Sequence, residues 1–159
     1  MQIKVAKPFL KKITYPIFYI AYGSNLNKYQ MQKRCPYAEP ITKSYIEGCG
    51  LLFRSVATII KEKESIMPCG IWRISEDCEK ALDKYEGYPD MYGKEYWEGD
   101  FEGKTYPFLV YIMNKHVRSI APPHPVYLEK IKNGYKDFDI SLRYLKNHEQ
   151  LEVFFKNMP

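Results

Sequence analysis

A glycine that directly follows a compact apolar run is the first feature of this sequence that could do chemistry. The segment Tyr19–Asn25 reads YIAYGSN, and the apolar residues of Ile17–Ala21 predict a buried strand leading into it. A glycine at a strand end lets the backbone approach a ligand and direct several N–H groups at one point. Such donors bind a carboxylate or a developing oxyanion. An ordinary turn has the same composition, so both interpretations stay open here.

A glutamate at the end of a predicted helix is the second feature. We expect Ser75 to cap this helix and Gly87 and Pro89 to end it, which places Glu86 in its last turn. Its apolar residues recur at helical spacing: Cys78, Ala81, Leu82 and Tyr85. The helix dipole disfavours a carboxylate at this end, and such local inconsistencies often mark functional residues. If it is partly buried, Glu86 would have a raised pKa and act as a base; a solvated helix-end glutamate is the alternative.

The cysteines and histidines show no spacing typical of a metal or redox site. No pair among Cys35, Cys49, Cys69 and Cys78 forms a C-x-x-C motif. We therefore expect four reduced, mostly buried thiols in a cytoplasmic protein. The histidines are His116, His124 and His148, and their spacing predicts no metal site and no cysteine–histidine pair.

Six strands and four helices are expected to position these residues. The expected strands are Ile17–Ala21, Tyr45–Arg54, Val56–Ile60, Ser65–Ile74, Glu95–Phe101 and Thr105–Met113, with a turn at Glu102–Lys104. The expected helices are one capped by Asn25 or Asn27 and ending near Arg34, one after Ser75, one from Pro125 to about Gly134, and one over Ile140–Phe155. The strands follow mostly in hairpin order. This favours an α+β fold with a mainly antiparallel six-stranded, β-barrel-like sheet and flanking helices.

Length and charge narrow the class of protein. The chain has 159 residues, which suits a single domain over 1–159, with residues 1–16 as an N-terminal extension and 135–159 as a C-terminal helical segment. We expect no transmembrane segment and no secretory signal. The net charge of +5 is scattered, and neither a nucleic-acid-binding motif nor a phosphate-binding glycine motif is present.

The two candidate segments resemble those of the γ-glutamylcyclotransferase-like family, in the same order and at a similar separation. The matching residues are Tyr22–Leu26 (YGSNL), Leu82–Gly87 (LDKYEG) and Tyr92. The likeness continues through Gly70–Ile74, Tyr111–Met113, Ala121–Pro123 and Pro125–Tyr127, with Ile131 and Gly134, and so spans about residues 17–134. Glutathione-specific relatives carry leucine where Asn25 stands, so the chain looks closer to the γ-glutamyl amino acid or amine branch.

This resemblance implies an intramolecular aminolysis in which the α-amine of a γ-glutamyl substrate attacks its own γ-amide carbon. The products would be 5-oxoproline and a free amine or amino acid. Glu86 would be the general acid and base. The implied substrate-binding residues are Tyr19, Ile20, Ala21, Tyr22, Gly23, Ser24 and Asn25 of the loop, together with Tyr127, Tyr92 and Tyr111. No cofactor or metal is implied, and we expect the leaving group to lie near Met67 and Met91.

Two other functions remain as alternatives. A non-catalytic module on the same fold would bind a small metabolite or a protein. A nucleic-acid binder would rely on the net charge of +5 alone. The favoured interpretation has a small-molecule partner, no nucleic acid and no membrane, in a monomer or homodimer; the sequence does not identify the leaving amine.

Overall fold

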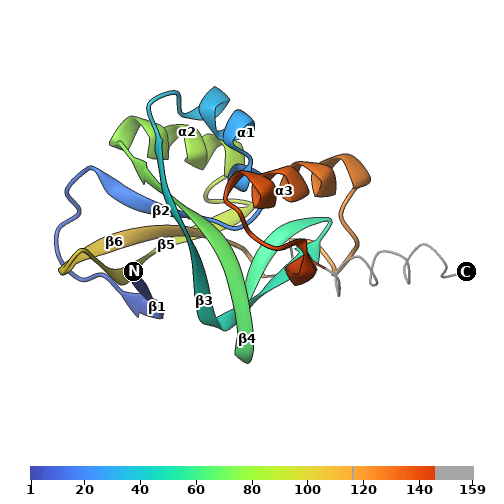
Figure 1. Cartoon of the computed structure of the whole chain (residues 1–159), viewed down its shortest axis with the longest axis horizontal. Helices are drawn as coiled ribbons and strands as arrows, with labels where there is room; N and C mark the ends of the chain where they lie inside the picture. The colour runs from blue at the N-terminus through green and yellow to red at the C-terminus, as the bar shows by residue number, and fades with distance from the viewer. Residues whose placement is uncertain (116, 146–159) are drawn as a thin grey trace, which may run out of the picture.

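One curled sheet with helices packed against it forms the protein (Figure 1). The computed structural model describes residues 1–115 and 117–145. The strands are β1 (Gln2–Pro8), β2 (Ile17–Ala21), β3 (Glu39–Arg54), β4 (Val56–Ile74), β5 (Tyr92–Phe101) and β6 (Lys104–Met113). The helices are α1 (Lys28–Arg34), α2 (Glu76–Glu86) and α3 (Pro125–Asp137), with single 3-10 turns η1 (Ser24–Leu26) and η2 (Leu142–Leu145).

The sheet has six strands in the order β1-β5-β6-β2-β4-β3. Neighbouring strands pair antiparallel except β2 and β6, which pair parallel through Phe18–Phe108 and Tyr19–Leu109. The expected α+β class and mainly antiparallel sheet are therefore confirmed. The predicted turn between β5 and β6 is also present, with positive φ angles of 50° at Glu102 and 79° at Gly103. Two consecutive positive φ angles are typical of tight hairpin turns, because their twist matches that of the strands.

Four strands differ from the prediction by more than one residue, and two of them, β3 and β5, differ only in beginning earlier, at Glu39 and Tyr92. The separate strands expected at Val56–Ile60 and Ser65–Ile74 are one continuous strand, β4, whose polar middle around Lys61–Glu64 is exposed. The N-terminal residues, expected as an extension, include β1 at the edge of the sheet, paired with β5. Lys4 and Lys7 of β1 bind Glu98 of β5. Lysines on an edge strand discourage pairing with other molecules. Ile3 and Val5 of β1 alternate with polar residues over only four positions, which is the shortest run that predicts a strand.

The helix ends follow the local signals. Asn27 caps α1 by accepting a hydrogen bond from the Gln30 N–H at 3.1 Å. Ser75 caps α2 in the same way, through the Cys78 N–H at 3.1 Å. Gly87 ends α2 with a φ of 67°, which glycine adopts without steric cost. The helix begun by Pro125 continues three residues beyond Gly134, to Asp137.

The last predicted helix, Ile140–Phe155, falls largely outside the described residues. Within the described part, residues 142–145 form the 3-10 turn η2 rather than an α-helix. No helix in residues 1–115 and 117–145 has the length and apolarity needed to cross a membrane.

The core lies between the sheet and its helices. Trp72 of β4, Trp97 of β5 and Phe108 of β6 are among its largest fully buried side chains. Leu82 of α2 and Ile131 of α3 are also fully buried. Burial of large apolar side chains is the main stabilising term of the fold, so α2 and α3 are held firmly against the sheet.

The expectation of four reduced cysteines is wrong for one pair. Cys35, which follows α1, forms a disulfide with Cys78 of α2, and their Cα atoms are 5.2 Å apart. Spacing along the chain could not indicate this pair, because it is 43 residues apart in sequence and is brought together by the packing of α1 on α2. Cys49 and Cys69 are free and buried. The cysteines therefore no longer support a cytoplasmic location.

Candidate active site

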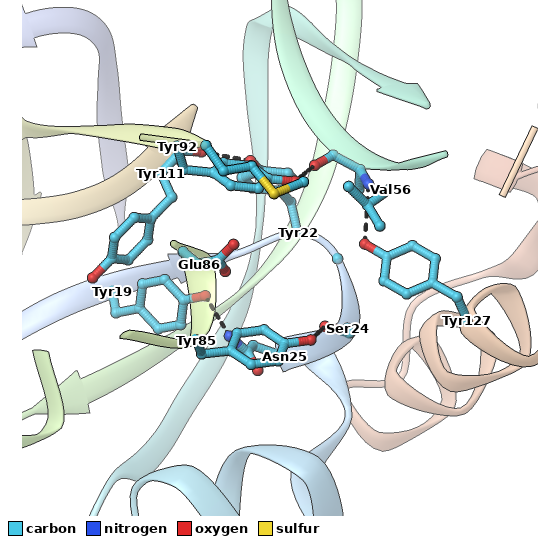
Figure 2. A pocket seen from close by; sticks show the side chains of 13 residues that line it. Tyr19, Tyr22, Ser24, Asn25, Val56, Tyr85, Glu86, Tyr92, Tyr111 and Tyr127 are labelled. Atoms are coloured by element: carbon cyan, nitrogen blue, oxygen red, sulfur yellow. Dashed lines mark hydrogen bonds between the residues drawn. The ribbon is translucent and has the colours of Figure 1, made fainter. Parts of the chain in front are cut away.

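A cavity of about 170 Å³ lies where the end of β2, the end of α2 and the start of α3 meet (Figure 2). It is lined by Tyr19, Tyr22, Gly23, Ser24, Asn25, Val56, Ala57, Tyr85, Glu86, Met91, Tyr92, Tyr111 and Tyr127. All the site residues expected from the sequence are in this set except Ile20 and Ala21. Those two are fully buried in the sheet, where they pair with Ile71 and Gly70 of β4 and hold the loop that follows.

Glu86 contributes the acidic group of the cavity. Its side chain is half-buried, and its carboxylate lies among the tyrosines (Figure 2). Burial raises the pKa of Glu86 to about 7, because it disfavours the charged form, although the nearby Arg34 guanidinium lowers it. Within the described residues, this carboxylate has no hydrogen bond or ion pair. A group with this pKa takes up and releases protons near neutral pH.

The loop Gly23–Asn25 forms the facing side of the cavity. A Cβ atom at Gly23 would lie 3.2 Å from the Tyr127 hydroxyl and 3.3 Å from the Ala57 Cβ, so only glycine fits without displacement. The backbone carbonyl of Asn25 accepts a hydrogen bond of 3.1 Å from Nε1 of the buried Trp72. Residues 24–26 form one 3-10 turn, and the N–H groups at the start of a helical turn have no acceptor within it.

Tyrosine hydroxyls fix the strands around the cavity. The Tyr22 hydroxyl donates to the backbone carbonyl of Tyr111 at 2.5 Å, and the Tyr92 hydroxyl donates to that of Ala57 at 2.5 Å. The Tyr127 hydroxyl accepts from the Ala57 N–H at 3.0 Å. Burial raises the pKa of Tyr22, Tyr92 and Tyr127, so these phenols remain neutral near pH 7. They give the cavity a rigid, uncharged aromatic wall.

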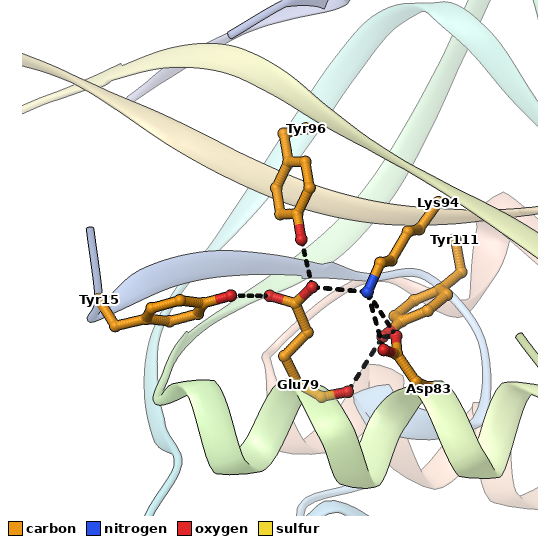
Figure 3. Close-up of polar contacts among 6 residues, drawn as sticks. All are labelled: Tyr15, Glu79, Asp83, Lys94, Tyr96 and Tyr111. Carbon is orange, nitrogen blue, oxygen red and sulfur yellow. Dashed lines mark hydrogen bonds and ion pairs between the residues drawn. The ribbon is translucent and has the colours of Figure 1, made fainter. Parts of the chain in front are cut away.

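Tyr111 presents its ring rather than its hydroxyl to the cavity. Its hydroxyl donates to Asp83 of α2 at 2.6 Å, on the side away from Glu86 (Figure 2). Asp83 belongs to a polar network that also contains Lys94 and the buried Glu79 (Figure 3). Tyr111 thus connects the cavity wall to the contacts that hold α2 on the sheet.

Several site residues were not identified from the sequence. Val56, Ala57 and Tyr85 line the cavity, and Tyr85 shares a hydrogen bond of 2.8 Å with the Ser24 hydroxyl. Tyr85 directly precedes Glu86, and this position could have indicated a role in the site. Its spacing from the apolar residues Cys78, Ala81 and Leu82 favoured a position in the core instead. Of the two methionines expected near the leaving group, Met91 lines the cavity. Met67 does not, because it is buried in β4 opposite Ile46.

The described part of the chain contains no cluster of three or more histidine, cysteine, aspartate or glutamate side chains arranged to hold an ion. Of the three histidines, His124 lies in the described residues. Its side chain caps α3 by accepting a hydrogen bond from the Val126 N–H at 3.1 Å.

A family model described as gamma-glutamyl cyclotransferase, AIG2-like, matches residues 19–151. The chain belongs to this family. The match includes both the loop after β2 and the end of α2, the two segments that face each other across the cavity. The resemblance found in the sequence is thereby confirmed at the level of the family. No curated protein matches the chain significantly.

Solved structures share this fold. A protein named gamma-glutamyl cyclotransferase superposes with a TM-score of 0.73 at 25% identity, covering 86% of this chain and 88% of its own. An uncharacterized protein from Homo sapiens gives 0.72 at 25% identity over 86% and 88% of the two chains. YkqA from Bacillus subtilis gives 0.69 at 22% identity over 92% of this chain and 56% of its own, and shows the fold alone.

Proposed function

We propose that this protein is a γ-glutamyl cyclotransferase that converts a γ-glutamyl amine or amino acid to 5-oxoproline and the released amine. The observation that carries the proposal is the Glu86 carboxylate, which faces the Gly23–Asn25 loop across one cavity and has no partner of its own among the described residues. Family membership and the structure named gamma-glutamyl cyclotransferase support the same activity.

The proposed reaction begins with the substrate's α-amine, which must lose a proton as it attacks the γ-amide carbon. Glu86 accepts that proton while the new N–C bond closes the five-membered ring. The carbonyl oxygen becomes negatively charged, and backbone N–H groups of the Gly23–Asn25 loop stabilise it. Glu86 then gives the proton to the leaving nitrogen as the original C–N bond breaks. Protons and charges balance, and no covalent enzyme intermediate forms.

Confinement of the substrate is the second contribution to the rate. The attacking amine and the amide carbon belong to one molecule, so the enzyme has only to hold a folded conformer in which the two are close. The rigid tyrosine wall and the close approach of Gly23 to Tyr127 are suited to this. Tyr92, Tyr111 and Tyr127 would pack against the glutamyl group, and Met91 and Val56 would contact the leaving amine.

The test is release of 5-oxoproline from a panel of γ-glutamyl amides by the wild type, Glu86→Gln and Glu76→Gln. Glu86→Gln keeps the shape of the side chain but cannot accept a proton, so we expect turnover to fall by roughly 10²–10⁴-fold. Glu76 is exposed in the first turn of the same helix, so its substitution is a charge-matched control that should leave turnover unchanged.

Wild-type rates in Glu86→Gln would exclude Glu86 as the base. Absence of 5-oxoproline from every substrate, together with measurable binding, would instead favour the non-catalytic module.

A further inference from the structure

The guanidinium of Arg34, the last residue of α1, contacts both halves of the proposed active site. Its Nη1 donates to the side-chain oxygen Oδ1 of Asn25 at 2.6 Å. Its Cζ lies 3.4 Å from the centroid of the Tyr85 ring, a stacked cation–π contact. Asn25 belongs to the loop after β2, and Tyr85 directly precedes Glu86 in α2. One side chain therefore bridges the loop and the end of α2.

The contacts of Arg34 extend into a short hydrogen-bonded chain. Because Asn25 accepts from Arg34 through Oδ1, its amide nitrogen points the other way and donates to the Tyr19 hydroxyl at 3.0 Å (Figure 2). Tyr85, beneath the guanidinium, shares its hydroxyl hydrogen bond with Ser24 of the same loop. The loop is thus linked to α2 directly through Ser24 and Tyr85, and a second time through Arg34.

We propose that Arg34 is a positioning residue that holds the Gly23–Asn25 loop against the last turn of α2. The distance between the backbone N–H groups of the loop and the Glu86 carboxylate is thereby kept constant. The proposal rests on the proposed function for its effect on turnover. Its structural content does not depend on that function. A planar guanidinium can stack on a ring and donate in its own plane at once, which an ammonium group cannot do.

Electrostatics give Arg34 a second role at the same place. Within the described residues, the titratable side chains that line the cavity with Glu86 are all tyrosines: Tyr19 of β2, Tyr22 just after it, Tyr85 on α2, Tyr92 on β5, Tyr111 on β6 and Tyr127 on α3. Asp83 and Lys94 lie beyond the Tyr111 ring and pair with each other. Among the described residues, Arg34 is therefore the cation that acts on Glu86, and its charge lowers the pKa of that carboxyl against the effect of burial.

Three variants separate the roles. Arg34→Met removes both charge and geometry, Arg34→Lys keeps the charge, and Lys33→Met is the control. Lys33 is the exposed neighbour on the same helix, and its ammonium lies over the Tyr29 ring. The measurements are the pKa of Glu86 from NMR titration of its carboxyl carbon, hydrogen exchange of the loop amides, and the pH profile of 5-oxoproline release. The Glu86 signal is assigned by its loss in Glu86→Gln.

In Arg34→Met we expect the Glu86 pKa to rise above about 7. We also expect faster exchange of the Leu26 and Asn27 amides, which donate to the Gly23 and Ser24 carbonyls of the loop. We expect kcat to fall by roughly ten- to a hundredfold, with a smaller change in KM. In Arg34→Lys the pKa should stay near the wild-type value while amide exchange and kcat change as in Arg34→Met. Lys33→Met should match the wild type in every measurement.

Unchanged amide exchange in both Arg34 variants would overturn the positioning role, whatever the turnover. An unchanged Glu86 pKa in Arg34→Met would overturn the electrostatic role. If the wild type releases no 5-oxoproline from any substrate, the proposed function fails, yet the two NMR measurements still decide the role of Arg34. If Arg34→Met does not fold, Arg34→Lys decides the positioning role by the same exchange measurement.

Discussion

Among single side chains, Glu86 sets the expected pH dependence of turnover. Its raised pKa, about 7, means that the carboxylate form needed for proton abstraction is lost as pH falls through neutrality rather than near 4.5. The substrate's α-amine titrates separately, at about 8 in a free α-amino group. The logarithm of kcat/KM should therefore rise with slope two below pH 7, with slope one up to about pH 8, and level off above it.

Initial rates between pH 4 and 10 check this prediction. An inflection near pH 4.5, the ordinary value for a glutamate, would show that Glu86 is solvated in the working enzyme and is not held by the cavity.

The sequence indicated Glu86 and the loop for the same reason: each carries its signal in adjacent residues. Glu86 stands at an unfavourable helix end beside Gly87, and Gly23 follows a buried strand. Arg34 carried no such signal, because its partners Asn25 and Tyr85 meet it only when α1 packs next to α2. A residue whose role depends on nonlocal contacts cannot be identified from a single sequence by local pattern.

At the scale of the element, α2 depends on a polar network for its place on the sheet (Figure 3). The Glu79 side chain is only 5% exposed, and its carboxylate accepts from Lys94 at 2.8 Å, from the Tyr15 hydroxyl at 2.8 Å, and from the Tyr96 hydroxyl. Lys94 also donates to Asp83 at 2.8 Å. Lys94→Met would leave a buried carboxylate without its cation, and we expect a loss of about 3 kcal/mol in unfolding free energy.

Urea denaturation measures this loss, and Lys7→Met is the matched control. Lys7 also binds a carboxylate, Glu98, but the Lys7 side chain is 56% exposed, so loss of this pair should lower the unfolding free energy much less than loss of Lys94. Equal losses of unfolding free energy in the two variants would contradict the prediction that the buried ion pair contributes more than the exposed one. Because α2 carries Glu86, Lys94→Met should also lower the turnover per folded molecule.

Elements with local signals were foreseen, and those defined by pairing were not. The cap Ser75 and the turn at Gly103 were identified, and the cap of α1 was narrowed to Asn25 or Asn27, because each of these signals acts over a few residues. The strand β1 was missed because its lysines are stabilised by β5, about ninety residues away. The single strand β4 was divided because its middle lies exposed, where polar residues carry no strand signal.

For the molecule as a whole, the Cys35–Cys78 disulfide links the end of α1 to α2 across 43 residues. Closing a loop of this length restricts the unfolded chain, which contributes about 4 kcal/mol in the chain-entropy model. The double variant Cys35→Ser, Cys78→Ser should lose stability of this order in urea denaturation. A reductant should lower the stability of the wild type to that of the double variant and leave the double variant itself unchanged. Equal stability of the two proteins without reductant would contradict the prediction.

The candidate cavity is also a property of the whole molecule. Its residues come from seven elements, β2, η1, β4, α2, β5, β6 and α3, and from the loops that follow β2 and α2. The order of motifs along the chain indicated most of them through the family resemblance. It could not show that Ile20 and Ala21 turn into the sheet, that Met67 lies elsewhere, or that Val56 and Ala57 at the β3–β4 turn complete the wall. Those placements depend on register and curvature, which only the folded sheet determines.

The hydrogen bond from Trp72 to the Asn25 carbonyl gives the protein an optical reporter of its own site. The chain has only two tryptophans, and the other, Trp97, lies in β5 with its indole N–H bonded to Glu95. A ligand that shifts the loop carbonyl would change the emission of Trp72 without any dye or label. Occupancy could then be followed by fluorescence in Glu86→Gln, in which the bound molecule would persist unconverted.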